Sequence, residues 1–257
     1  MPIGRNGQDF IVNSTTDNNQ GSPSIAALAD GRFVATWTSS DSGDGSGSCI
    51  RARVYNADGS AAGNDFIVNS TTESAQVNPS ITALAGGRFV VTWESGDAGD
   101  GSGSCIRARL HNADGSAAGN DFIVNPTTAD GQFNPSVTAL ADGRFVVTWE
   151  SDDTGDGSGA CVRGRVYNAN GTAAGNDFIV NSTTDNGQFS PSITTLADGR
   201  FVVTWVSEDA GDGSGLCIRG RVYNANGTAA GNDFIVNSTT ESIPLHRSRR
   251  WPTAASW

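Results

Sequence analysis

The sequence predicts an all-β protein, built as a β-propeller-like array of four-stranded antiparallel blades. Three observations predict this class. A segment of 56 residues recurs along the chain, each copy holds four short apolar runs separated by turn signals, and no apolar stripe follows the helical period of about 3.6 residues. Four antiparallel strands per unit are typical of a propeller blade, whereas one solenoid coil usually takes only about 20–30 residues.

Identical landmarks fix the period. The pentapeptide DFIVN occurs five times at a constant spacing, first at Asp9–Asn13 and last at Asp233–Asn237. One tryptophan and one cysteine keep the same spacing, at Trp37, Trp93, Trp149 and Trp205 and at Cys49, Cys105, Cys161 and Cys217. We therefore expect a leader of residues 1–8, then a repeat domain over 9–240. This domain comprises a lone N-terminal strand and four complete repeats at about 22–77, 78–133, 134–189 and 190–240.

The fourth repeat shows the four predicted strands most clearly. They are Ser190–Leu196, Arg200–Val206, Leu216–Tyr223 and Asp233–Asn237, and they are rich in the β-branched and aromatic residues that strands favour. The dipeptide Asp198-Gly199 between the first two strands is a strong hairpin signal. The sequence therefore predicts antiparallel neighbours in chain order within each blade.

The second strand is apolar on both faces, as expected of a sheet that packs between two neighbouring blades. Phe201, Val203 and Trp205 share one face, and Val202 and Thr204 share the other. We expect the four repeated tryptophans to fill the contacts between blades and the four cysteines to be small buried apolar residues. Equivalent cysteines of neighbouring blades lie beyond the roughly 7 Å limit for a disulfide.

Composition excludes several classes of partner. The formal net charge is −11, and the sequence contains no lysine. An acidic chain is repelled by nucleic-acid backbones and anionic membranes, so neither is expected to bind. The missing lysine also excludes Schiff-base chemistry and Walker-type phosphate loops. No apolar run approaches the roughly 20 residues of a membrane helix, and the N-terminus shows no signal-peptide core.

The loop between the second and third strands carries the most suggestive chemistry. In an antiparallel blade this loop and the link to the next blade emerge on one side, which we call the long-loop face. Each loop contains two aspartates in a glycine-rich setting, and such loops can bind Ca²⁺ weakly through carboxylate and carbonyl oxygens or simply form turns. The predicted metal residues are Asp41, Asp44, Asp97, Asp100, Asp153, Asp156, Asp209 and Asp212.

Catalysis is not expected from these patterns. The two histidines, His111 and His246, fall outside the repeat pattern, and no nucleophile elbow is present. Four nearly equal copies favour repeated binding, because an active site usually breaks symmetry. Two alternatives remain open: a lectin-like glycan binder that uses rim tryptophans on the long-loop face, and a glycan hydrolase that uses the loop carboxylates of the Asp41 and Asp44 type.

The C-terminal residues depart from the repeat. Residues 241–257 form an irregular tail, and codons can be chosen that read its last residues in a shifted frame as AALADGRFV, the start of another repeat. We therefore interpret the tail from about residue 243 as a frameshifted remnant of a fifth repeat. A lone fourth strand at one end and a missing fifth unit at the other predict open blade edges, through which the protein can form homo-oligomers.

The repeat resembles those of very large secreted bacterial proteins of the RTX, or haemolysin-type calcium-binding, kind. The resemblance covers about residues 9–240 and is carried by ADGRFVVTW, GDGSG and RVYNANGTAAGNDFIVN. Such repeats are also similar to FG-GAP-type blades, which implies Ca²⁺ at the two aspartates of each loop. We therefore expect a secreted or cell-surface binding and adhesion module that takes a glycan or protein ligand on the long-loop face.

Overall fold

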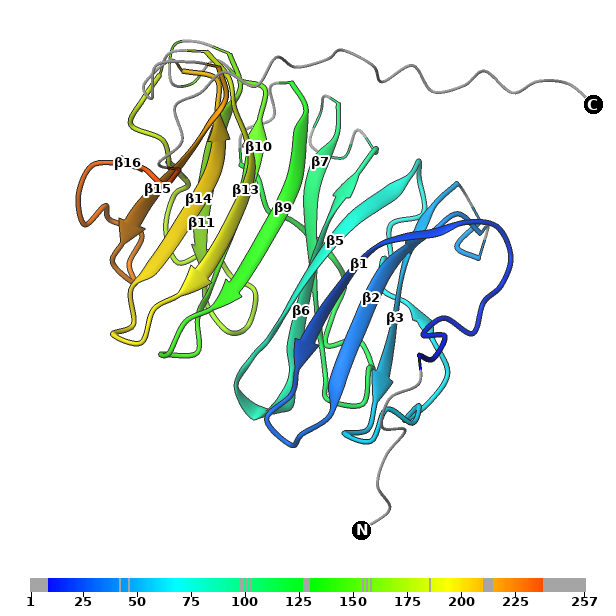
Figure 1. Cartoon of the computed structure of the whole chain (residues 1–257). Coiled ribbons are helices and arrows are strands. Elements are labelled where there is room, and N and C mark those ends of the chain that lie inside the picture. The colour runs from blue at the N-terminus through cyan, green and yellow to red at the C-terminus, as the bar shows by residue number, and fades with distance from the viewer. Residues whose placement is uncertain are drawn as a thin grey trace, which may run out of the picture.

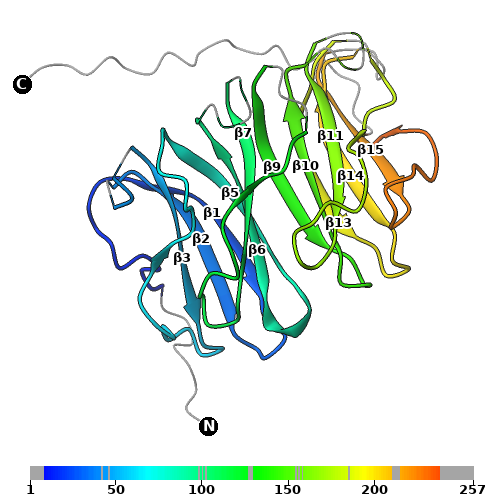
Figure 2. The ribbon, with the colours of Figure 1, turned by 180° about the vertical axis from the view of Figure 1, so that it is seen from behind.

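The computed structural model describes residues 9–237, apart from positions 42, 46, 98, 100, 102, 127–129, 154, 156, 158, 185 and 210–214. In this part of the chain, four sheets of four antiparallel strands lie side by side as a fan (Figures 1 and 2). The predicted all-β, propeller-like class is confirmed. The described residues include one short 3-10 helix, η1 (Ala85–Gly87), and no helix that could span a bilayer. The predicted leader and irregular tail lie outside the described residues.

Each of the four repeats forms one blade, with its strands paired in chain order. The first strands are β1 (Gln20–Ala27), β5 (Gln76–Ala83), β9 (Gln132–Ala139) and β13 (Gln188–Thr195). The second strands are β2 (Phe33–Ser39), β6 (Phe89–Ser95), β10 (Phe145–Ser151) and β14 (Phe201–Ser207). The third strands are β3 (Cys49–Tyr55), β7 (Cys105–His111), β11 (Cys161–Tyr167) and β15 (Cys217–Tyr223). The fourth are β4 (Phe66–Ile67), β8 (Phe122–Ile123), β12 (Phe178–Ile179) and β16 (Phe234–Ile235).

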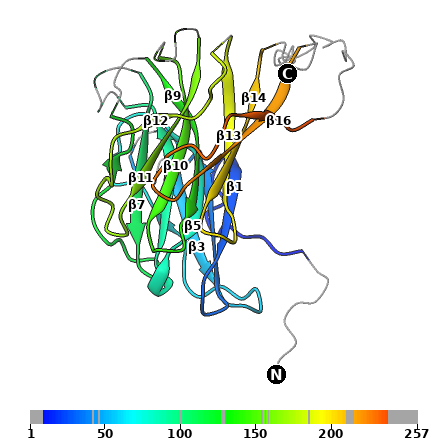
Figure 3. The same cartoon turned by 90° about the vertical axis from the view of Figure 1, so that its left-hand side faces the viewer.

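The first strands lie innermost. They contact one another in the order β1, β5, β9, β13. Strands β1 and β13 make no comparable contact, so the four described blades do not close into a ring. Figure 3 shows β1 and β13 on one side of the molecule and the third strands β7 and β11 on the other. The inner edge of each blade therefore faces a shared axis, and the outer edge faces away from it.

Each first strand is interrupted by a bulge at the residue before a proline. The pairing register shifts there, and the bulge residue is left-handed, with φ between 47° and 54°, at Ser22, Asn78, Asn134 and Ser190. Proline has no N–H to give to the ladder, which interrupts the pairing at this point. The bulge turns the bulge residue out of the ladder, and all four bulge residues line one hollow at the axis.

The DFIVN segments form less strand than the sequence predicts. Only Phe66 and Ile67 of the first complete blade pair with β3, and beyond them Val68 donates its N–H to the Ile50 carbonyl. The N-terminal segment Asp9–Asn13 belongs to no ladder, yet it occupies the place of a fourth strand in front of the first blade. The Tyr55 hydroxyl donates to the Val12 carbonyl. Tyr167 and Tyr223 donate in the same way to the equivalent valines, Val124 and Val180, of the preceding blades.

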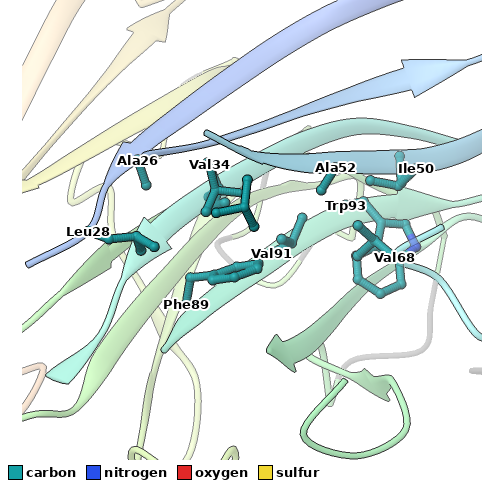
Figure 4. Packing of buried hydrophobic residues seen from close by; sticks show 11 residues of the cluster. Ala26, Leu28, Val34, Ile50, Ala52, Val68, Phe89, Val91 and Trp93 are labelled. Atoms are coloured by element: carbon teal, nitrogen blue, oxygen red, sulfur yellow. The ribbon is translucent and has the colours of Figure 1, made fainter. Parts of the chain in front are cut away.

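The hydrophobic core lies between blades rather than within one. Figure 4 shows Val34, Ile50 and Val68 of the first blade facing Phe89, Val91 and Trp93 of the second. Equivalent clusters join the second blade to the third and the third to the fourth. The predicted packing between blades is confirmed for Trp93, Trp149 and Trp205, whereas the buried Trp37 lies in a separate cluster of the first blade, against the N-terminal segment. The free cysteines are buried as expected.

One core position differs between repeats in a way that leaves an unmet hydrogen bond. His111 stands where the other blades have tyrosine; its ring stacks on Phe89, and its Nδ1 lies 3.1 Å from the Gly115 carbonyl oxygen. Among the described residues, no partner meets the buried Nε2 atom. Burial lowers the pKa of His111 to about 4, so the imidazole is neutral in the folded protein at neutral pH.

Replacing His111 with tyrosine should stabilise the protein. Tyr167 shows the expected contact, a hydroxyl 2.6 Å from the carbonyl oxygen of Val124, and His111→Tyr should make the same bond to Val68. The expected gain in free energy of unfolding is about 1 kcal/mol at pH 7.5. It should widen towards pH 5, because the unfolded histidine binds a proton below about 6.5 while the folded one does not.

Urea denaturation at pH 7.5 and at pH 5 measures both effects. The reverse change, Tyr167→His, is the matched control and should lower stability at both pH values, more strongly at the lower one. Equal stability of the wild type and His111→Tyr at both pH values would contradict this account of the core.

Candidate functional site

The first loop aspartate of each blade is buried in an ion pair. Asp97 is 4 % exposed, and its Oδ2 lies 2.7 Å from Nη2 of Arg107 on the adjacent third strand. The Cys105 thiol donates to the same carboxylate at 3.2 Å. The same pairing with an arginine ten residues later recurs at Asp41, Asp153 and Asp209.

Each of these arginines also reaches a second aspartate, the one that opens the DFIVN segment. Arg107 Nη1 lies 3.3 Å from Asp121 Oδ1, and the other oxygen of Asp121 accepts the backbone N–H groups of Ser70 and Thr71. Ser70 and Thr71 lie in the link between the first and second blades. The Asp–Arg–Asp triads therefore tie the long loop and the third strand to the preceding link.

The triad favours the ionised form of the first loop aspartate, as Asp97 shows. Burial alone would raise the pKa of Asp97, but the hydrogen bonds from Cys105 and Arg107 and the charge of Arg107 lower it below its usual value. Burial and the neighbouring Asp41 carboxylate raise the pKa of the Cys49 thiol to about 12. These buried groups are therefore structural: the carboxylates stay paired, and the thiol does not form a nucleophilic thiolate at neutral pH.

The second loop aspartate can be placed in the first blade alone. Asp44 Oδ2 accepts the side-chain amide of Asn69 at 2.9 Å. Its predicted counterparts Asp100, Asp156 and Asp212 lie outside the described residues. Among the residues that the structure describes, no three acidic, cysteine or histidine side chains gather as metal ligands. Ca²⁺ binding stays a prediction, and a cation at Asp41 would compete with the guanidinium of Arg51.

A polar hollow of about 330 Å³ lies at the axis, where the four bulges meet. Its wall repeats one pattern from blade to blade, a serine or asparagine, then a proline, then in three blades a serine. The bulge residues Ser22, Asn78, Asn134 and Ser190 provide hydroxyl and amide groups. Such groups donate and accept hydrogen bonds, as the hydroxyls of a sugar require.

Two glutamates break the four-fold repeat beside this hollow. Position six of the second strand is Thr38 in the first blade, Glu94 in the second, Glu150 in the third and Val206 in the fourth. Both glutamates are partly exposed. Sequence reasoning missed this pair, although the signal was present: these are the acidic positions of the second strands, and they occur in adjacent repeats.

The walls of the hollow hold the two carboxylates. Asn78 donates its side-chain amide to Glu94 at 3.3 Å, and Asn134 donates its own to Glu150 at 3.0 Å. Burial raises the pKa of Glu94, and the negative charge of Glu150 raises it further, against the hydrogen bonds from Asn78 and Asn134. A carboxyl group with a raised pKa beside a second carboxyl group is an arrangement that acid–base chemistry uses.

The fold is shared with enzymes that act on glycans. The chain aligns with an endo-arabinase from Bacteroides thetaiotaomicron at a TM-score of 0.54 and 16 % identity, covering 85 % of this chain and 81 % of the other. It aligns with a GH93 α-L-arabinofuranosidase of Fusarium graminearum, solved with arabinobiose, at a TM-score of 0.58 and 11 % identity. This alignment covers 84 % of this chain and 66 % of the arabinofuranosidase. It aligns with the NanB sialidase from Streptococcus pneumoniae at a TM-score of 0.63 and 9 % identity, covering 90 % of this chain and 53 % of the sialidase. No family model and no curated protein sequence matches the chain.

These likenesses correct two expectations from the sequence. The resemblance to secreted calcium-binding RTX repeats is wrong, because the similar solved structures named above include glycoside hydrolases with this fold. The expectation that the protein is not an enzyme is contradicted by the same comparisons, because these structures of the same fold are enzymes. The predicted use of rim tryptophans is not supported, because all four side chains are at most 4 % exposed.

Removing one arginine tests whether the triads are structural. Arg107→Met leaves the buried carboxylates of Asp97 and Asp121 without their cation, and we expect a loss of about 3–5 kcal/mol in the free energy of unfolding. Arg200→Met is the matched control, because Arg200 pairs with Asp198 on an exposed hairpin, and it should cost at most about 1 kcal/mol. Equal losses in urea denaturation of the two variants would show that the triads do not support the fold.

Proposed function

We propose that the protein is a glycoside hydrolase, with its active site at the axial hollow. The observation that carries this proposal is the pair Glu94 and Glu150, the two carboxylates that break the repeat beside the hollow. Hydrolysis of a glycosidic bond generally needs two carboxyl groups, one protonated and one ionised. The second alternative drawn from the sequence therefore replaces adhesion as the main interpretation, but with different residues.

The loop aspartates named for that alternative are poorly suited to the reaction. The Asp41 carboxylate already accepts hydrogen bonds from Arg51, Cys49 and Gly43. A general acid must hold a proton near neutral pH, and this pairing keeps the pKa of Asp41 low. Glu94 has the opposite environment, since burial and a neighbouring negative charge favour its protonated form.

The proposed roles follow from these environments. Glu94 donates its proton to the leaving oxygen of the scissile bond. Glu150, whose Oε2 accepts hydrogen bonds from the Asn134 amide and the Ser190 N–H, provides the second carboxylate, which stabilises or attacks the sugar carbon or activates water. Asn78 and Asn134 position the two carboxyl groups and also line the hollow that would receive the sugar.

The proposed substrate is an arabinose-containing glycan. The support is the likeness to an endo-arabinase and to an arabinofuranosidase solved with arabinobiose, together with the hydroxyl and amide lining of the hollow. The chain spans 66 % of the arabinofuranosidase, so that enzyme holds parts with no counterpart in this alignment.

Glycan binding without hydrolysis is the second candidate, and one observation favours it. Thr38 accepts the N–H of the next blade's bulge residue, Asn78, and Glu150 accepts that of Ser190. The glutamates thus also tie neighbouring blades together, as threonine does in the first blade. A purely structural role for Glu94 and Glu150 would leave the hollow as a binding site.

Neutral substitutions of the two glutamates separate these candidates. Glu94→Gln and Glu150→Gln keep the size and hydrogen bonding of the side chains but remove the acid and the ionised carboxylate. We expect wild type to release reducing sugar from arabinan or arabino-oligosaccharides and each variant to lose about 100-fold or more in kcat, as loss of an acid–base group does. Glu208→Gln, an exposed carboxylate after β14, is the matched control and should keep full activity.

Binding of the same oligosaccharides is measured in parallel by calorimetry. Wild type that binds but does not hydrolyse would favour the second candidate. Equal kcat values for wild type, Glu94→Gln and Glu150→Gln would overturn the assignment of the two residues.

A further inference from the structure

The two ends of the fan present the two halves of a contact that the molecule already makes three times. At each contact, the back face of one blade packs on the front face of the next. The back face carries Ile50 and Val68 in the first blade, and the front face carries Ile81, Val91 and Trp93 in the second. These five side chains are at most 6 % exposed.

Within the part of the chain that the structure describes, no blade follows the back face of the fourth blade. Its Ile218 and Val236 are 37 % and 50 % exposed, whereas their counterparts Ile50 and Val68 are fully buried. Phe234 is also exposed, while the equivalent Phe66 packs against the core between the first two blades. The equivalent faces of the other blades are covered by the next blade, and an exposed apolar patch of this kind is typical of an interaction surface.

Among the described residues, only the segment Asp9–Asn13 precedes the front face of the first blade. Ile25 is 65 % exposed, and its counterpart Ile81 is 6 % exposed. A groove of about 370 Å³ lies beside it, lined by Val12, Ala35 and Trp37 among others. The Trp37 indole donates to Gln20 at 2.8 Å, the bond that Trp93 makes to Gln76, so this face has the internal bonding of a buried one.

We infer that two copies of the protein associate head to tail, with the back face of the fourth blade of one copy on the front face of the first blade of the other. The occupant is a second copy because the exposed residues at one end are the repeat equivalents of those that already cover the face at the other. The new contact therefore continues an interface whose packing the chain shows three times.

In this contact one segment must be displaced from the place of the fourth strand in front of the first blade. Asp9–Asn13 lies in front of the first blade in the place of a fourth strand, and β16 of the incoming blade would occupy the same place. Both segments read DFIVN. Either can therefore complete the incoming sheet beside its third strand, as in the exchange of identical elements in domain swapping.

A charge at either end should block association in a way that only a head-to-tail contact explains. Ile25→Asp damages the front face alone, and Ile218→Asp the back face alone. We expect wild type to associate as its concentration rises, each variant alone to remain monomeric, and an equimolar mixture to form one-to-one dimers through the two intact faces. Ala174→Asp, which adds the same charge at an exposed position of the third blade, should associate like wild type.

Sedimentation velocity in about 0.15 M salt measures these masses, because that ionic strength screens the repulsion between copies of charge −11 beyond about 8 Å. Circular dichroism and melting confirm that each variant is folded. Monomeric wild type throughout the concentration range would overturn the inference. So would association of Ile218→Asp alone, which would indicate a symmetric contact between front faces, or a mixture that stays monomeric.

Discussion

The structure depends on burial between successive sheets, since no blade has a core of its own. Each second strand is apolar on both faces, so a four-stranded sheet alone would expose one face or the other. Val34 and Ile50 become buried only when Phe89 and Trp93 of the next blade cover them. Stability is therefore a property of neighbouring pairs, as in other repeat proteins, and the terminal blades are the weak points of the array.

A polar network accompanies these apolar contacts at the long-loop end. Arg107 joins Asp97 in the loop to Asp121 in the fourth-strand segment, and Asp121 accepts N–H groups from the preceding link. The network recurs in every blade, as expected of groups that support the fold. Glu94 and Glu150 occur in only two of the four blades and are not part of this network.

The fold could be predicted from the sequence because its signals are local and repeated. The dipeptide Asp198-Gly199 predicts a hairpin, and the apolar residues on both faces of the strand that contains Trp205 predict a sheet buried on both sides. The site could not be predicted in the same way. Asp41 and Arg51 are ten residues apart, and only the pairing of β2 with β3 shows that the arginine neutralises the carboxylate that resembled a cation ligand. Glu94 and Glu150 are 56 residues apart in the sequence. Their hydrogen-bond partners Asn78 and Asn134 are bulge residues of the first strands, and both line the same hollow at the axis.

The bulges also separate the part of the axial wall that holds the blades together from the part that a ligand would meet. The tie between blades uses the backbone N–H of the bulge residue, as when Asn78 donates to Thr38, and any residue that adopts the left-handed conformation can make it. The side chain is not needed for this tie, and the position carries serine in the first and fourth blades and asparagine in the second and third. Each blade can thus present a different side chain at the axis while the backbone tie to its neighbour is kept.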